Sequence, residues 1–112
     1  MARANPLKKS VVYTGCKLSI YHPDRPADLD IDCIVVIGQG SIELKYDQDD
    51  GQFWSWKGPE QGEGHYVVNA NQENLGARGT LHRLRDGVYL EGYWAEGGFR
   101  GMWRVTLGNA DA

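Results

Sequence analysis

Hydrophobic and polar residues alternate along most of this chain, which is the period of a β-strand with one buried face. Residues 11–21 show the pattern at once and place five side chains on one face: Val12, Thr14, Cys16, Leu18 and Ile20. No window shows apolar residues recurring at spacings of three and four, so no helix longer than about one turn is expected. The alternation predicts an all-β protein.

Turn-forming residues divide the rest of the chain into further short strands. In residues 30–38, apolar side chains such as Ile34 and Val36 also occupy the second face, so the middle of this strand is expected to be buried on both sides. Proline and glycine mark two longer loops, at residues 22–28 and 58–64. The predicted strands are 11–21, 30–38, 41–47, 52–57, 65–70 and 76–84, followed by a hairpin over 88–107.

The final hairpin also has a predictable register. A two-residue turn at Gly97-Gly98 pairs Trp94 with Gly101, Gly92 with Trp103 and Glu91 with Arg104. Each glycine then lies opposite an indole that can cover the exposed backbone, and opposite charges meet on the other face. Moving the turn by one residue would lose these pairs, so we expect Gly97-Gly98 to form the turn.

Eight short strands joined by hairpin-length turns fit an antiparallel meander that closes, or nearly closes, into an up-and-down β-barrel. We therefore expect one barrel domain over residues 1–112, with flexible segments at 1–9 and 108–112. Residues 89–94 (YLEGYW) and 101–105 (GMWRV) resemble the strands of small calycin-like barrels, the avidin-like and lipocalin-like proteins. This resemblance implies the fold and transfers no binding residue.

The same region is also similar to one MORN repeat, a hairpin module with a Gly-x-Trp core. The similarity covers residues 90–97 together with Gly101. Repeat proteins need about three stacked units for stability, and this chain has a single copy. We therefore prefer a chance similarity between hairpins rich in glycine and tryptophan.

Composition and charge exclude several classes of protein. The chain has 112 residues and a net charge of -3, and no apolar run of about 18 residues that would span a membrane. Five arginines near Tyr89 and Tyr93 could contact nucleic acid, but the negative total charge makes such a partner unexpected. Cys16 and Cys33 lack metal-ligand spacing, so we expect two buried thiols in a cytoplasmic protein.

No arrangement of residues typical of an active site is visible. His22, His65 and His82 are far apart along the chain, and none has the paired spacing of a zinc site or an adjacent nucleophile. The acidic segments lack the order of a calcium loop. We therefore predict no catalytic residue, metal ion or cofactor and favour a non-enzymatic protein, although residues distant along the chain could still converge.

Aromatic residues are the strongest candidates for binding, because their rings offer a large contact area. We expect Leu90, Trp94, Trp103, Val105 and Leu107 to form the core. The predicted binding site is a barrel mouth beside the Gly-rich loop, lined by Trp54, Trp56, His65 and Tyr66, with Arg83 or Arg100 for an anionic group. The ligand would be small and partly apolar. Alternatively, the same aromatic face packs against a protein partner or a second copy in a homo-oligomer, the homodimer being the simplest.

Overall fold

Nine β-strands form a single antiparallel sheet in the part of the chain that the structure describes. The structure is a computed structural model that describes residues 10–47, 51–71 and 76–111. No helix long and apolar enough to cross a membrane occurs in these residues. The strands are β1 (Val11–Ile20), β2 (Asp28–Gly38), β3 (Ser41–Asp47), β4 (Phe53–Pro59), β5 (His65–Ala70), β6 (Arg78–His82), β7 (Tyr89–Glu96), β8 (Phe99–Thr106) and β9 (Asn109–Asp111).

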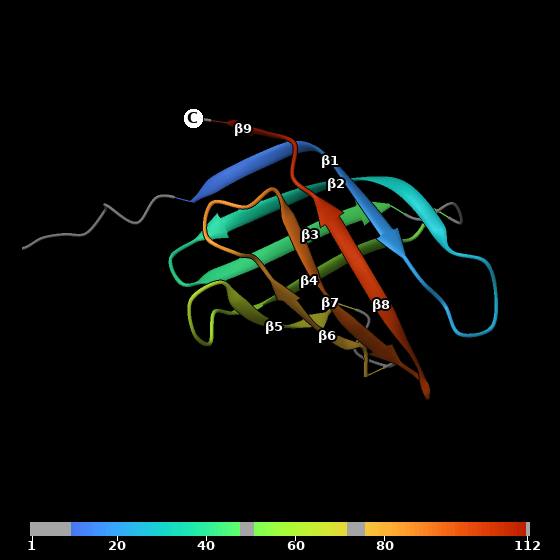
Figure 1. Cartoon of the computed structure of the whole chain (residues 1–112). Helices are drawn as coiled ribbons and strands as arrows, with labels where there is room; N and C mark the ends of the chain where they lie inside the picture. The colour runs from blue at the N-terminus through green and yellow to red at the C-terminus, as the bar shows by residue number, and fades with distance from the viewer. Residues whose placement is uncertain (1–9, 48–50, 72–75, 112) are drawn as a thin grey trace, which may run out of the picture.

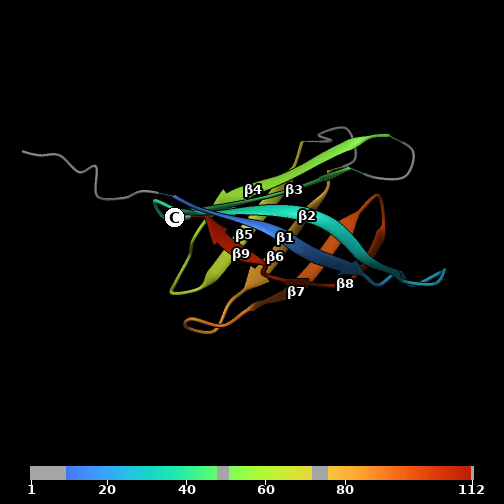
Figure 2. The same cartoon turned by 90° about the horizontal axis from the view of Figure 1, so that it is seen from above.

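The first eight strands close into an up-and-down barrel, as the sequence predicts. Each strand pairs with the next, and β1 pairs with β2 on one edge and with β8 on the other. Figure 1 shows the meander, and Figure 2 shows the same barrel from above. The short β9 pairs with the beginning of β1, in a segment for which the sequence predicted no strand. The predicted flexible residues 1–9 lie outside the described residues.

A bulge in β1 changes which face of this strand is buried. Tyr13 is opposite Val35 and Cys16 is opposite Cys33, so two residues of β1 face one residue of β2. Gly15 lies within this step with φ +68°, a left-handed conformation that favours glycine. Before the bulge Tyr13, not Thr14, packs against the core. The predicted unbroken alternation of β1 is therefore wrong before residue 16, because a bulge shifts the alternation by one residue.

The prediction that β2 is buried on both faces is also wrong. Cys33 and Val35 are buried, whereas Ile34 is 40% exposed and Val36 is half-buried. Because the described residues form one closed sheet with no second layer over this strand, only the inner face is fully covered. The two thiols, Cys16 and Cys33, are buried and free. Burial raises the pKa of the Cys33 thiol to about 12, so this thiol is protonated at neutral pH.

Inward-facing side chains from all eight barrel strands form the core. All five residues predicted for the core are buried: Leu90, Trp94, Trp103, Val105 and Leu107. The register of the last hairpin is also confirmed, with Trp94 opposite Gly101, Gly92 opposite Trp103 and Glu91 opposite Arg104. On the outer face, Arg104 Nε donates to Glu91 Oε2 over 2.7 Å.

Glycines allow strands and indoles to approach one another inside the barrel. A Cβ atom on Gly101 would lie 3.0 Å from the Trp94 ring and 2.0 Å from the Tyr21 carbonyl oxygen. The Trp103 ring covers Gly79 of β6, where an added Cβ would lie 2.8 Å from the ring. The indole of Trp103 donates to the Thr80 carbonyl oxygen over 2.8 Å. Small residues at these positions therefore make room for large aromatic rings.

The barrel has two ends with different connections. At the first, here called the β1–β2 end, the loop of residues 21–27 joins β1 to β2, and the Gly97-Gly98 turn joins β7 to β8. At the second, here called the β2–β3 end, the Gln39-Gly40 turn lies near the loop of residues 61–64, since Glu60 donates its backbone N–H to the Gly40 carbonyl oxygen. Strand β4 runs from the β1–β2 end to the β2–β3 end.

Replacing Gly92 by alanine tests the close approach of β6 and β7. The new Cβ would lie 1.9 Å from the Thr80 carbonyl oxygen, so the backbone must shift. We expect Gly92→Ala to lower the free energy of unfolding by about 1–3 kcal/mol or more, measured by urea denaturation. The matched control is Glu91→Ala on the exposed face of β7, which should cost about 0–1 kcal/mol. Equal effects of the two substitutions would contradict the register.

Candidate ligand-binding cavity

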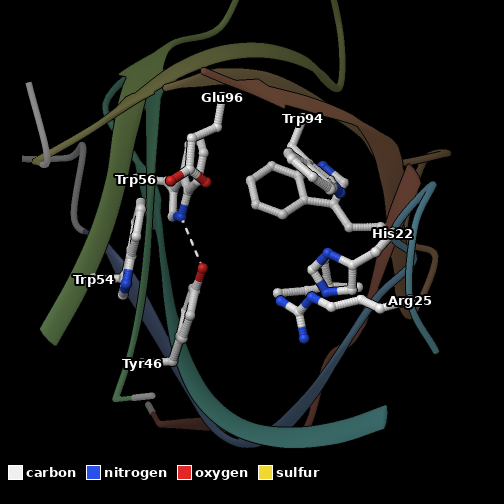
Figure 3. Close-up of a pocket in the computed structure, with 9 residues that line it drawn as sticks. His22, Arg25, Tyr46, Trp54, Trp56, Trp94 and Glu96 are labelled. Atoms are coloured by element: carbon white, nitrogen blue, oxygen red, sulfur yellow. Dashed lines mark hydrogen bonds between the residues drawn. The ribbon is translucent and has the colours of Figure 1, made fainter. Parts of the chain in front are cut away.

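A cavity opens inside the barrel at the β1–β2 end. Its volume is about 140 Å³. Figure 3 shows aromatic rings on two facing walls, with polar groups between them. The residues that line it are Ile20, His22, Arg25, Tyr46, Trp54, Trp56, Trp94, Glu96 and Trp103.

Strands β3 and β4 form one aromatic wall of the cavity. Alternation along β4 points Trp54 and Trp56 inward, and their rings stack with centroids 5.7 Å apart. The indole N–H of Trp56 donates to the hydroxyl oxygen of Tyr46 over 3.0 Å. Burial raises the pKa of Tyr46, so the phenol is neutral at physiological pH. This wall is therefore uncharged and offers two parallel indole faces.

The indole N–H of Trp54 differs from that of Trp56, because the structure shows no hydrogen-bond partner for it. Trp54 is 5% exposed, and its Nε1 atom is buried. A buried donor without a partner costs about 1–3 kcal/mol of stability, so such groups are rare and call for an explanation. Other atoms of Trp54 line the cavity, but Nε1 is covered by surrounding protein atoms and does not face the cavity space.

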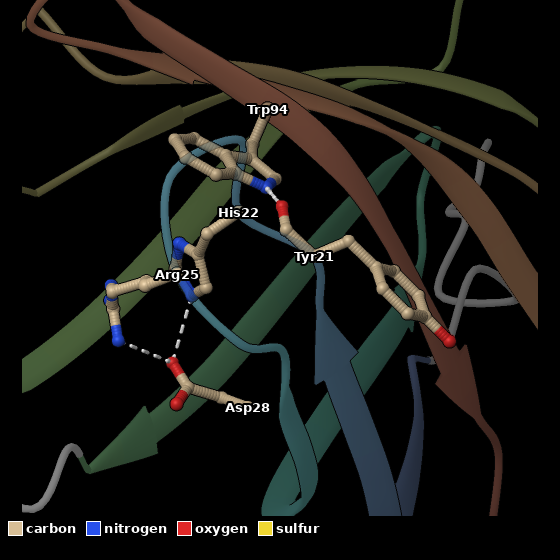
Figure 4. A network of polar contacts seen from close by, with 5 residues as sticks. All are labelled: Tyr21, His22, Arg25, Asp28 and Trp94. Atoms are coloured by element: carbon tan, nitrogen blue, oxygen red, sulfur yellow. Dashed lines mark hydrogen bonds and ion pairs between the residues drawn. The ribbon is translucent and has the colours of Figure 1, made fainter.

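The facing wall comes from β7, β8 and the loop after β1. Trp94 donates its indole N–H to the Tyr21 carbonyl oxygen over 3.2 Å, which ties β7 to the end of β1 (Figure 4). The His22 ring meets the Trp94 ring edge-on, with centroids 5.5 Å apart. Trp103 contacts Trp56 edge-on, with ring centroids 4.7 Å apart, so the two walls touch each other.

An ionic cluster lies at the rim of the cavity. The His22 Nε2 atom is 2.9 Å from Asp28 Oδ2, and an Arg25 guanidinium nitrogen is 3.6 Å from the same oxygen (Figure 4). The His22 side chain is largely buried, whereas Arg25 is more than half exposed. Asp28 therefore balances the positive charge of Arg25 and orients the His22 ring.

Glu96 places a carboxylate within the aromatic cavity. It follows Leu90 and Trp94 on the inner face of β7, and its side chain is one of those that line the cavity (Figure 3). The structure shows no hydrogen bond to this carboxylate within the described residues. Burial raises the pKa of Glu96, and His22 partly opposes the shift. A second hollow of about 390 Å³ shares Glu96, His22, Arg25 and Trp94 and extends the site outward.

The residues predicted for one binding mouth lie in three different places. Trp54 and Trp56 line the cavity, but they are buried and do not flank the Gly-rich loop, because β4 begins at the β1–β2 end and reaches that loop only at its other end. Tyr66 is buried at the β2–β3 end. His65 pairs with His82 there, with ring centroids 4.3 Å apart.

The two candidate arginines do not reach the cavity. The Arg83 guanidinium donates to the Gly87 carbonyl oxygen over 2.7 Å and to the Tyr13 hydroxyl over 3.4 Å, so it holds the loop after β6 at the β2–β3 end. Arg100 lies on the outer face of β8 beside Tyr93 and Met102. The six predicted residues are therefore not brought together by the fold.

Seven of the nine residues that line the cavity were not predicted for the site. Trp94 and Trp103 were expected in the core and Ile20 on one face of the first strand, and the others are His22, Arg25, Tyr46 and Glu96. Tyr46 and Glu96 carried a usable signal, because each lies in the inward phase of its predicted strand close to the strand end. His22 and Arg25 belong to a loop with no periodicity, so their position could not be inferred. Within the described ranges, no group of three or more His, Cys, Asp or Glu side chains could hold a metal ion.

Comparisons with known proteins add no further assignment. No protein-family model, curated protein or solved structure matches this chain.

The two stacked tryptophans give a matched test of the hydrogen bonding. Trp56→Phe removes the N–H that donates to Tyr46, whereas Trp54→Phe removes an N–H with no partner. We expect Trp56→Phe to cost about 1 kcal/mol more in the free energy of unfolding than Trp54→Phe, measured by urea denaturation. A Trp56→Phe and Tyr46→Phe double-mutant cycle isolates the bond. If the two tryptophan substitutions lower the free energy of unfolding equally, and the cycle shows no coupling between Trp56 and Tyr46, the Trp56 N–H does not have this role.

The raised pKa of Glu96 predicts how stability depends on pH. The folded protein holds the Glu96 proton more tightly than the unfolded chain, so stability falls as pH rises from the usual glutamate range through the raised pKa. The other charged or titratable residues that line the cavity with Glu96 are His22, Arg25 and Tyr46. Glu96→Gln should therefore stabilise the protein at pH 7 and leave its stability unchanged at a pH where Glu96 is protonated.

Urea denaturation from pH 4 to pH 8 measures this difference. The control is Glu91→Gln on the outer face of the same strand, where the side chain pairs with Arg104 and is about half exposed. We expect no comparable gain in stability from the control. A Glu96→Gln variant that is less stable than the parent protein at pH 7 would refute the prediction.

Proposed function

We propose that this protein is a non-enzymatic β-barrel that binds a small, partly apolar molecule in the cavity at the β1–β2 end. The observation that carries the proposal is the lining of this cavity, in which four indoles and a phenol surround the space. Binding sites for small molecules are concave and mostly apolar, with a few polar groups that orient the ligand. Glu96 and the rim around Asp28 provide such polar groups here.

The cavity volume limits the size of the ligand. An apolar cavity of about 150 Å³ is large enough to hold benzene, and the cavity here has about 140 Å³. The inner part of the site therefore suits a group of about six to eight non-hydrogen atoms. A longer ligand can extend past His22 and Glu96 into the adjoining hollow.

The barrel type agrees with this function. Eight antiparallel strands in meander order, with a site inside one end, are also the plan of calycin-like barrels. We extend the calycin-like resemblance to this chain as a proposal, together with an intracellular setting in which Cys16 and Cys33 stay reduced.

A ligand screen tests the proposal directly. The purified protein is titrated with small neutral, cationic and anionic organic compounds, each with an aromatic or branched aliphatic group. A ligand that binds only the folded state must raise the apparent melting temperature. Because four tryptophans line the cavity, binding should also change their fluorescence emission. We expect at least one chemical class to produce both changes with the same dissociation constant.

A pair of variants on one strand locates the binding. Trp54→Leu changes the cavity wall without removing a hydrogen bond seen in the structure, and it should weaken binding by about tenfold, since it removes most of one aromatic contact surface. The neighbouring Phe53 is 48% exposed and does not line the cavity, so Phe53→Leu serves as the control. Equal effects of both substitutions, or no binding of any compound, would refute the proposal.

Self-association is a second candidate, although not through the aromatic face that the sequence suggested. Trp54, Trp56 and Tyr66 are buried inside the barrel. The outer face of β7 and β8 instead exposes Tyr93 and Met102, which are 47% and 62% exposed. Exposed apolar patches often mark contacts between proteins. This candidate would be favoured if no compound of the ligand screen binds and the molecular mass of the protein in sedimentation experiments rises with its concentration.

A further inference from the structure

The carboxylate of Glu96 gives the cavity a negative charge that the structure does not balance. Arg25 is the positively charged residue that lines the cavity, and its guanidinium is paired with Asp28. His22 also contacts the Asp28 carboxylate. With histidine counted as neutral, the charges of Arg25 and Asp28 cancel and that of Glu96 is left. Asp24, which lines the adjoining hollow, adds a further negative charge.

The aromatic walls also attract positive charge. The face of an aromatic ring is electron-rich, and a cation within about 6 Å of its centre is stabilised, most strongly by tryptophan. Trp54 and Trp56 present stacked indoles on one side, and Trp94 lies on the other side of the cavity (Figure 3). Glu96 lines the same cavity, so a cation in this space lies near both the rings and the carboxylate.

Glu96 is half-buried, so its ionised form is less favourable in the cavity than in water unless a ligand compensates it. Burial in an aromatic environment disfavours the charged form, and a neutral ligand would displace water from Glu96 without replacing its hydrogen bonds. An anionic ligand would add repulsion. A cationic ligand removes the penalty, because it supplies the missing counter-charge.

We infer that the ligand is an organic ammonium ion whose alkylated nitrogen lies among Trp54, Trp56 and Trp94, with the Glu96 carboxylate as its counter-ion. This inference rests on the proposed function of the cavity and specifies its ligand class. Alkyl groups on the nitrogen contact the rings, and the small volume favours a compact head group.

The anionic ligand suggested by the sequence does not suit this cavity. Arg83 is engaged with Gly87 and Tyr13 at the other end of the barrel, and Arg100 lies on the outer face. Arg25 alone remains at the rim, where Asp28 neutralises it. The cavity therefore has no free positive group from the described residues to hold an anion.

Three probe molecules of nearly the same shape separate the effect of charge from that of size. Choline is cationic, 3,3-dimethylbutan-1-ol is its neutral carbon analogue, and 3,3-dimethylbutanoate is an anion of similar bulk. Each is titrated into the full chain at pH 7.5 and constant ionic strength, with binding followed by tryptophan emission and calorimetry. We expect choline to bind at least about tenfold more tightly than the neutral analogue, and the anion not to bind.

Two variants assign the charge preference to Glu96. Glu96→Gln keeps the shape of the side chain and removes its charge, so the preference for choline over the neutral analogue should fall by about tenfold. The neutral analogue should bind this variant at least as tightly as it binds the parent protein. Glu91→Gln removes the same charge from the outer face of β7 and should leave all three affinities unchanged.

The possible results distinguish the two proposals. If the neutral analogue or the anion binds as tightly as choline, the cavity is a ligand site but the inference of a cationic ligand is wrong. If choline fails to bind while another compound of the screen binds, the inference of a cationic ligand is also wrong. If no compound of any charge binds, the proposed function itself fails. A choline preference that survives Glu96→Gln overturns the role of Glu96.

Discussion

Strand β1 hydrogen-bonds along both of its edges, and the closed barrel depends on this double pairing. One edge pairs with β2, and the other pairs with β9 before the Gly15 bulge and with β8 after it. The bulge is held by the Cys16 thiol, which accepts from the backbone N–H of Gly108 over 3.3 Å. Closure removes exposed sheet edges and creates an interior that side chains must fill.

The two halves of that interior are filled differently. Aliphatic residues such as Val68, Leu81 and Leu90 are fully buried, as in an ordinary core. Toward the β1–β2 end, large indoles occupy the interior and need glycines such as Gly79 and Gly101 beside them. A cavity of about 140 Å³ is left among these rings. The cavity thus follows from where the tryptophans gather.

The polar groups of the cavity follow from the position of strand ends. Tyr46 lies near the end of β3, Glu96 ends β7, and His22 and Arg25 belong to the loop between β1 and β2. An up-and-down barrel brings these ends together at one mouth. Trp94 reinforces the arrangement, because its indole binds the Tyr21 backbone and contacts His22. Stability and the candidate site therefore depend on the same residue.

The sequence by itself determined the strands and most of their buried faces, because alternation is a local property of each strand. It also determined the register of β7 and β8, since a two-residue turn leaves little freedom between neighbouring strands. Only the tertiary structure decided that Trp54 and Trp56 lie away from the Gly-rich loop, that Gly15 reverses the faces of β1, and that Glu96 enters an aromatic cavity. These features depend on strand direction, a bulge and barrel closure, which relate residues distant along the chain and leave no local pattern.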